Sequence, residues 1–329
     1  MNTTVFTAET LEQAATLLRR GELVAFPTET VYGLGAVATL EQAVSQVYQA
    51  KGRPSDNPLI VHVSTVQQVL DAVVEFPPVA EQLAAAFWPG PLTMILEQKP
   101  HYFAPSVTKL ATVAFRMPNH PLALELIQEV GIPIVGPSAN KSGRPSPTRV
   151  AHVLEDMNGR IAGVVDGGIC TIGVESTVID LTNPIGPVIL RPGAITAEQL
   201  ERVIGPLATN TTHNEQEAPK APGMKYRHYA PETRVVVFRG LIEDVQQEVE
   251  HYKQQGLRVG ILATNRYQQL SEHFYSLGEY GDVQSMTRQL FDGLRTLDQE
   301  PIDLILAEGL PEEGNSLAYM NRLNKAAVK

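Results

Sequence analysis

The chain contains a single cysteine, Cys170, and only 6% aromatic residues. One cysteine excludes a disulfide framework within the chain and is typical of a protein from a reducing compartment. No apolar run approaches the roughly 20 residues of a membrane-spanning helix, and the first residues lack the basic and then apolar pattern of a secretory signal. We therefore expect a cytoplasmic protein that makes no use of a membrane.

Familiar catalytic signatures are also missing. No GxxxxGK[ST] sequence is present, so any triphosphate is held without a P-loop, and the C-terminal third has no GxGxxG sequence to support a dinucleotide site. No HExxH or CxxC spacing indicates a metal site, and Ser176 lacks the GxSxG elbow of a serine nucleophile. We expect neither a covalent nucleophile nor a dedicated protein site for a metal ion.

Acidic residues outnumber basic ones, giving a net charge of −10. This charge argues against a broad nucleic-acid-binding surface. Residues 102–149 differ, because they carry five cations and two carboxylates, a local net of +3. An acidic protein with a basic segment suits a small anionic ligand better than a polyanion.

The length of 329 residues predicts two domains. Strand-like and helix-like runs alternate through residues 1–205 and predict an α/β or α+β domain built on one large twisted sheet. Residues 206–231 are polar and proline-rich and predict a linker. Residues 232–329 contain near-continuous apolar runs typical of strands buried on both faces, which predict a small Rossmann-like parallel α/β domain.

The stretch 26–62, FPTETVYGLGAVATLEQAVSQVYQAKGRPSDNPLIVH, organises the first domain. Hydroxyls and one carboxylate crowd its first turn, and Thr39-x-x-Gln42 predicts a capping box for the helix that follows. Lys51 and Arg53 stand at the end of this helix, which we expect to be exposed. The two cations either offset the helix dipole or bind phosphate, and the local pattern leaves both interpretations open.

Polar residues follow the predicted strands at four places: 28–30, 112–116, 138–140 and 175–177. Ligands of open sheets bind at such strand ends. The groups gathered there are cations and hydroxyls, without a strong nucleophile. This set favours a reaction in which the substrates supply the chemistry and the protein supplies charge and position, such as phosphoryl or adenylyl transfer.

Five separated motifs occur in order: Phe26-Pro-Thr-Glu-Thr-Val-Tyr-Gly-Leu-Gly35, Lys51-Gly-Arg53, Asn57-Pro-Leu59, Pro137-Ser-Ala-Asn140 and Gly173-Val-Glu-Ser-Thr177. Together they resemble the threonylcarbamoyl-AMP synthase family, with its YrdC-like domain and its KxR sequence followed far downstream by SxN. The resemblance covers about residues 8–205 and implies an α/β domain in which one large twisted mixed sheet forms a concave cleft. Residues 222–231 and 320–327 resemble the long, two-domain form of the family.

The resemblance implies a nucleotidyltransferase that converts L-threonine, bicarbonate and ATP into L-threonylcarbamoyl-adenylate and pyrophosphate. Mg²⁺ would accompany ATP. The product would pass to a downstream threonylcarbamoyl-transfer machinery that modifies the adenosine beside the anticodon of tRNAs, and no stable nucleic-acid binding is expected of this chain.

The resemblance also implies roles for individual residues. L-Threonine would be held by Thr30, His62, Arg116 and Ser176, with Arg116 pairing the substrate carboxylate. ATP would be held by Lys51, Arg53, Asn57, Thr112, Ser138, Asn140, Ser146, Arg191 and Tyr226, of which Lys51, Arg53, Ser138 and Asn140 would be catalytic. We further expect residues 222–229 to fold over the site as a lid, the alternative being a linker that only packs on either domain.

Two other functions are consistent with parts of the pattern. A non-catalytic RNA-binding protein of translation would use a basic concave surface, against which the net charge of −10 argues. The second alternative is a carbamoyl- or adenylyl-transfer enzyme that acts on another acceptor, because related domains occur in hydrogenase-maturation proteins. Those proteins carry zinc fingers, which a single cysteine excludes.

Overall fold

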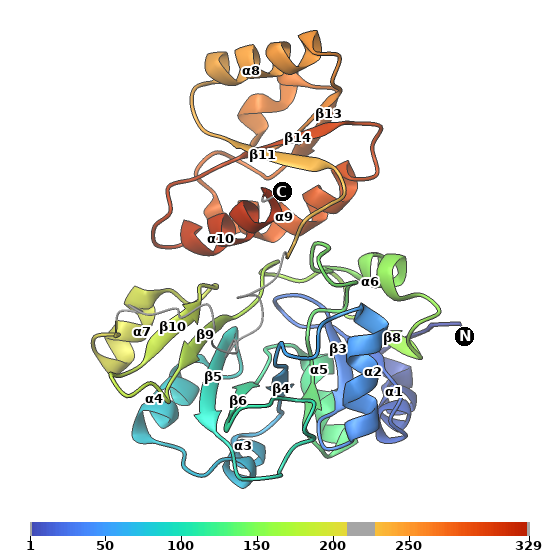
Figure 1. Cartoon of the computed structure of the whole chain (residues 1–329), viewed down its shortest axis with the longest axis vertical. Helices are drawn as coiled ribbons and strands as arrows, with labels where there is room; N and C mark the ends of the chain where they lie inside the picture. Colours follow the sequence, from blue (N-terminus) through green and yellow to red (C-terminus); the bar gives the residue numbers. More distant parts are fainter. Residues whose placement is uncertain (1, 209–227, 328–329) are drawn as a thin grey trace. The chain divides into compact units, whose positions relative to one another are not determined.

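The computed structural model describes residues 2–208 and 228–327, which form two compact units (Figure 1). The described part of the first unit comprises residues 2–142, 147–170 and 175–208. The second comprises residues 143–146, 171–174 and 228–327. Two short segments of the N-terminal sequence thus belong to the second unit. Most of the predicted linker and lid, Tyr226 included, lies outside the described residues.

The first unit is built on a ten-stranded mixed sheet with the order β1-β8-β2-β3-β7-β4-β6-β5-β9-β10. Its strands are β1 (Thr4–Phe6), β2 (Val24–Phe26), β3 (Gly33–Val37), β4 (Ile60–His62), β5 (Leu92–Glu97), β6 (Thr112–Arg116), β7 (Ile134–Val135), β8 (Gly163–Val165), β9 (Thr177–Asp180) and β10 (Val188–Arg191). Parallel and antiparallel pairs alternate irregularly, which confirms the predicted large mixed sheet.

The helices of the first unit are η1 (Ala8–Thr10), α1 (Leu11–Arg19), α2 (Glu41–Lys51), α3 (Val66–Ala72), α4 (Pro78–Phe87), α5 (Pro121–Val130), α6 (Val150–Met157) and α7 (Ala197–Ile204). Helices α1 and α5 bury Leu18 and Leu126 with Phe26 of β2 in one core cluster. A larger cluster joins α2 to the central strands. Apolar side chains at helical spacing explain both contacts.

The N-terminus of α2 differs from the sequence-based prediction, because Leu40 rather than Thr39 is the N-cap and no side chain caps it. Leu40 has an extended backbone, so Thr39 lies outside the helix and the predicted capping box is wrong. Glu41 accepts a hydrogen bond from the Ser106 amide instead, at 3.0 Å. The C-terminus agrees with the prediction, since Gly52 takes the left-handed conformation with φ of 63°.

The second unit contains a four-stranded, fully parallel sheet with the order β11-β14-β12-β13. Its elements are β11 (Arg234–Phe238), α8 (Ile242–Gln254), β12 (Val259–Ala263), η2 (Asn265–Leu270), β13 (His273–Ser276), α9 (Val283–Leu297), β14 (Leu304–Glu308) and α10 (Ser316–Ala327). Helix α8 covers one face, and α9 and α10 cover the other (Figure 1). This arrangement confirms the predicted parallel α/β domain. Within residues 2–208 and 228–327, no helix has the length and apolarity to cross a membrane.

Candidate active site

One face of the first sheet carries polar groups on four adjacent strands. Strands β4 and β6 pair in parallel with His62 opposite Arg116, and β6 pairs with β5 so that Thr112 lies opposite Glu97. Since side chains alternate along a strand, His62, Arg116 and Thr112 share one face. Thr93 of β5 and Asp180 of β9 lie on the same face, because Ile95 pairs with both Ala114 and Asp180. The opposite face belongs to the main core cluster.

A small apolar cluster separates these polar groups on the same face. It consists of Ile60, Ile95, Ala114 and Val178, with Leu190 packed against it. The polar side chains therefore lie around an apolar cluster, and small-molecule sites commonly combine apolar surface with a few polar groups in this way.

Arg116 leaves the end of β6 and is only 4% exposed. Its Nη1 donates to Thr30 Oγ1 at 2.8 Å, and its Nη2 lies 2.8 Å from Glu29 Oε2. Nε donates weakly to the Gly90 carbonyl at 3.4 Å. The structure thus joins two of the predicted threonine-binding residues, Thr30 and Arg116, directly.

Ser176 immediately precedes β9 and is held by Arg191 from the end of β10. Arg191 Nη2 donates to Ser176 Oγ and its Nε to the Ser176 carbonyl, each at 3.1 Å. The hydroxyls of Ser176 and Thr93 lie 2.8 Å apart. Gly193 makes this packing possible, because a Cβ there would lie 2.2 Å from the Thr177 amide nitrogen.

Lys51 connects the KxR and SxN sequences. Its ammonium donates to the carbonyls of Ser138 and Asn140, the latter at 2.7 Å. Lys51 is 4% exposed, so the expectation of an exposed helix end is wrong for this residue. Lys51 is buried because the end of α2 packs against the turn that follows β7. The Ser142 amide of this turn donates a hydrogen bond to the Lys51 carbonyl.

Arg53 and Asn57 lie on the loop between α2 and β4. Arg53 is half-buried, and its Nη2 donates to the carbonyls of Asn57 and Pro58 at 3.3 and 3.1 Å. The side-chain oxygen of Asn57 is buried and receives no hydrogen bond within the described part of the chain. An acceptor in this state is ready for a ligand donor or a metal ion.

His62 is neutral throughout the physiological pH range. Burial, reinforced by the nearby positive charge of Arg116, lowers its pKa to about 3. Nδ1 lies 3.3 Å from the Ile60 carbonyl, and the ring packs edge-on against Phe26. The neutral imidazole is thus a hydrogen-bonding group that adds no charge.

Two predicted residues are not among those described above. Ser146 is buried and belongs to the second unit, and Tyr226 lies outside the described residues. The remaining predicted positions are all in the first unit. Their ligand roles stay predictions.

Sequence reasoning gave no role to two residues that the structure places in the site, Glu29 and Thr93. Glu29 stands inside the first of the five motifs, between two threonines, which was an available signal. Thr93 was visible only as a hydroxyl in an otherwise apolar strand.

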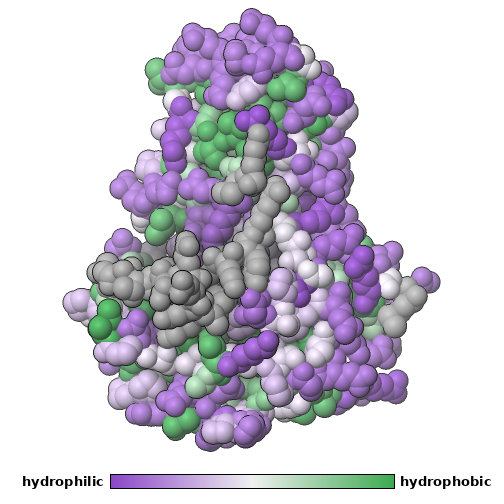
Figure 2. Space-filling view, viewed as in Figure 1, coloured by the Kyte–Doolittle hydropathy of each residue, from purple (hydrophilic) through white to green (hydrophobic). Residues whose placement is uncertain are grey.

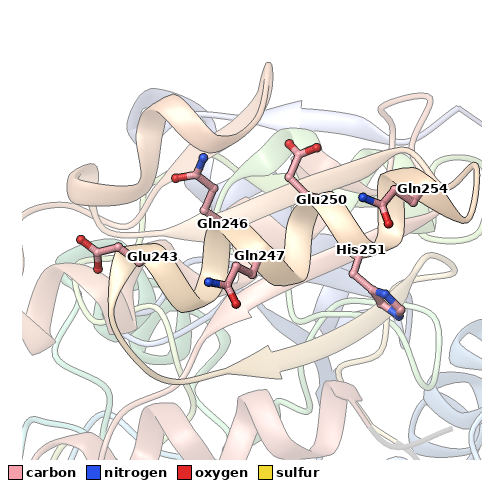
Figure 3. Close-up of a pocket in the computed structure, with 6 residues that line it drawn as sticks. All are labelled: Glu243, Gln246, Gln247, Glu250, His251 and Gln254. Atoms are coloured by element: carbon pink, nitrogen blue, oxygen red, sulfur yellow. The ribbon is translucent and has the colours of Figure 1, made fainter.

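A surface hollow of the second unit contains none of the predicted site residues. Its lining consists of Glu243, Gln246, Gln247, Glu250, His251 and Gln254 of α8. Figure 3 shows that these side chains leave one helix without converging on a common point, and the surface over α8 is hydrophilic in Figure 2. We read it as the solvated face of an amphipathic helix.

The charged groups buried around the polar face are of both signs. Lys51, Arg116 and Arg191 are buried in the first unit with Glu29, Glu175 and Asp180. The three cations are the groups that suit an anionic ligand. Guanidinium groups favour carboxylate and phosphate in particular.

Two family models match consecutive parts of the chain. One, described as "Telomere recombination", matches residues 16–193, and the other, described as "Threonylcarbamoyl-AMP synthase, C-terminal domain", matches residues 195–328. The chain belongs to the threonylcarbamoyl-AMP synthase family. The resemblance inferred from the five motifs is thereby confirmed.

Similar proteins of this family match over nearly their whole length. The chain is 51% identical to threonylcarbamoyl-AMP synthase of Bacillus subtilis, over 96% of this chain and 92% of that protein. It is 48% identical to threonylcarbamoyl-AMP synthase of Pyrococcus abyssi, over 95% and 93%. The crystal structure of P. abyssi Sua5 complexed with L-threonine matches with a TM-score of 0.92 at 44% identity, covering 99% of this chain and 98% of that one.

Proposed function

We propose that the protein is a nucleotidyltransferase that forms L-threonylcarbamoyl-adenylate and pyrophosphate from L-threonine, bicarbonate and ATP. One observation supports this most strongly: buried cations and hydroxyls gather on one sheet face, and family membership gives these groups a matching reaction. The mixed anhydride forms between two substrates, so the protein needs no nucleophile of its own.

Arg116 is the proposed partner of the threonine carboxylate. Its guanidinium already contacts Thr30 and Glu29, which fix its orientation. A planar guanidinium in a buried site pairs a carboxylate with bidentate geometry. Thr30, His62 and Ser176 surround this position with hydroxyl and imidazole groups, and the neutral ring of His62 serves as a hydrogen-bond partner.

The amine of L-threonine takes up the carboxyl group of bicarbonate, and water leaves. An oxygen of the resulting carbamate then attacks the α-phosphorus of ATP, and the bond to pyrophosphate breaks. Negative charge that develops on the phosphates is best stabilised by pre-positioned cations. We assign this role to Lys51, Arg53 and Arg191.

Asn57, Thr112, Ser138, Asn140, Ser146 and Tyr226 complete the proposed ATP-binding set. Lys51 supports the assignment of Ser138 and Asn140, because it fixes the backbone of both. Mg²⁺ is proposed to enter with ATP as part of the substrate, since this ion keeps water and phosphate oxygens as its main ligands. The side-chain oxygen of Asn57 receives no hydrogen bond from the described residues and is a ligand atom of the type that Mg²⁺ binds.

The product is an activated carbamate, so its consumer must be an enzyme that transfers the threonylcarbamoyl group to an acceptor. We propose that this acceptor is the adenosine beside the anticodon of tRNA and that the transfer is done by separate machinery. The net charge of −10 favours release of a small molecule over a stable complex with tRNA.

Mass spectrometry of reaction products tests the proposal. The full chain is incubated with ATP, L-threonine and ¹³C-bicarbonate, and each substrate is omitted in turn. We expect a nucleotide product carrying both threonine and the ¹³C label, with one pyrophosphate released per product. A labelled adenylate that forms equally well without threonine would instead indicate another acceptor. The absence of any labelled nucleotide would reject the function.

A further inference from the structure

Glu29 is a buried carboxylate with fewer partners than such a group usually has. The turn that carries it is fixed by Thr28, whose hydroxyl accepts hydrogen bonds from the amides of Thr30 and Val31. Glu29 itself is 6% exposed. Neither of its carboxylate oxygens receives a well-formed hydrogen bond within residues 2–208 and 228–327. Its ion-pair partner there is Arg116.

A carboxylate in this state is costly, because burial removes its hydration and one ion pair does not satisfy all its lone pairs. Buried polar groups in folded proteins are nearly always hydrogen-bonded. The remaining acceptor capacity of Glu29 therefore indicates a donor that arrives with a ligand.

The position of Glu29 indicates which donor this is. Its Oε2 lies 2.8 Å from Nη2 of Arg116, the guanidinium assigned above to the substrate carboxylate. An α-amino acid carries its carboxylate and its ammonium on the same carbon, so a carboxylate paired with Arg116 brings the ammonium close to Glu29. Arg116 and Glu29 together then neutralise both charges of a zwitterion in a site that excludes water.

The other titratable groups around Glu29 offer no competing anion. Arg116 is a cation, and His120 is weakly basic because burial lowers its pKa. Burial raises the pKa of the Cys170 thiol to about 12, so it stays neutral. Glu175 is another buried glutamate of the first unit, and it is the natural comparison.

We propose that Glu29 binds the α-ammonium group of the amino-acid substrate, and thereby selects zwitterionic amino acids over simple carboxylates. This assignment rests on the proposed function. The substrate nitrogen keeps one N–H after it becomes a carbamate, so the same oxygen of Glu29 remains a hydrogen-bond acceptor for it through the reaction.

Calorimetric binding to the full chain tests the proposal with two probes. One is L-threonine and the other is 3-hydroxybutyrate, which keeps the carboxylate and the hydroxyl but lacks the amine. The wild-type protein should prefer L-threonine. Glu29→Gln should lower the affinity for L-threonine by about 10- to 100-fold, the effect of losing a hydrogen bond to a charged group. It should lower the affinity for 3-hydroxybutyrate far less, because the amide oxygen of glutamine can still accept from Arg116.

Glu175→Gln is the matched variant, because it also neutralises a buried carboxylate of the site. We expect it to keep the preference for L-threonine. If Glu29→Gln lowers the affinity for both probes equally, Glu29 only orients Arg116, and the proposal is overturned. The proposal is also overturned if Glu175→Gln, and not Glu29→Gln, removes the preference for L-threonine.

The wild-type measurement can overturn the assignment even if Glu29→Gln does not fold. Equal wild-type affinity for the two probes overturns the assignment of Glu29 while leaving the proposed function standing. Failure of the wild-type protein to bind L-threonine would overturn the proposed function, and this assignment with it.

Discussion

The ammonium of Lys51 and the carbonyl oxygen of Asn140 lie 2.7 Å apart although 89 residues separate them along the chain. With the contact to Ser138, this bond fixes the turn after β7 against the end of α2. Lys51 is therefore a structural link within the site as well as a cation proposed to act on phosphate.

Replacing Lys51 tests both parts of this role. Lys51→Met removes hydrogen bonds from a charged donor to buried carbonyls, so the free energy of unfolding should fall by about 2–3 kcal/mol, and adenylate formation should be lost. Urea denaturation and pyrophosphate release measure the two effects. Lys99→Met is the control, because Lys99 also donates to two backbone carbonyls, those of Leu70 and Asp71, but is exposed. Equal destabilisation by both variants would contradict the role of burial.

Replacing Arg53 should lower the rate of the reaction much more than it lowers the stability of the fold. Arg53→Ala should cost on the order of 2–4 kcal/mol of transition-state stabilisation, the usual effect of removing a group aimed at developing charge. Its stability cost should be only about 1 kcal/mol, since the side chain donates two hydrogen bonds within its own loop. Steady-state kinetics and urea unfolding provide the numbers, with the exposed Arg160→Ala for comparison. Product formation at the wild-type rate would favour the helix-dipole interpretation of this cation.

His62 makes stability depend on pH in a defined window. The pKa of His62 in the folded protein is about 3, whereas the pKa of a histidine in an unfolded chain is about 6.5. Between these values the unfolded chain binds a proton that the folded chain does not, so stability falls as the pH drops below about 6.5. The loss due to His62 should reach about 2 kcal/mol at pH 5.

Urea unfolding at pH 7 and pH 5 measures this effect. The stability difference between pH 7 and pH 5 should shrink by about that 2 kcal/mol in His62→Gln, because glutamine does not titrate. The exposed His101→Gln should leave the difference as in the wild-type protein. An unchanged pH dependence in His62→Gln would show that folding does not lower the pKa of this ring.

Substrate specificity follows from the polar character of the site around Arg116. A buried partner for the threonine hydroxyl rejects valine strongly, whereas a pocket for its methyl group rejects serine by only about 1–3 kcal/mol. We therefore expect measurable turnover of serine and almost none of valine in the mass-spectrometric assay. Comparable turnover of valine and threonine would rule out a hydroxyl contact.

Gly136 tests how closely the backbone approaches the site. A Cβ there would lie 2.6 Å from His62 Nδ1 and 2.8 Å from Phe26 Cζ. Gly136→Ala should destabilise the protein by about 1–3 kcal/mol through overpacking, and should weaken threonine binding because the His62 ring is displaced. Thermal unfolding and calorimetry check these results. Ala151→Ser is the control, because Ala151 is exposed. Gly168→Ala would not serve, since Gly168 has a φ of 78°, at which any other residue is strained.

The sequence alone determined the fold class and the family. Apolar runs and their spacing predicted one large sheet followed by a smaller parallel one, because local periodicity reports which face of a strand or helix is buried. The five motifs identified the family, since their order along the chain carries the signal. Gly52 was also predictable, because a helix end needs a left-handed residue.

Only the tertiary structure decided which groups meet. The burial of Lys51, the link between Ser176 and Thr93, and the pairing of Arg116 with Glu29 all depend on strand register and on turns far apart in the sequence. The misplaced cap of α2 has the same origin, since the backbone at Leu40 is set by its neighbours and not by the capping pattern. Local propensity is worth about 1 kcal/mol per residue or less, so long-range packing overrides it wherever the two disagree.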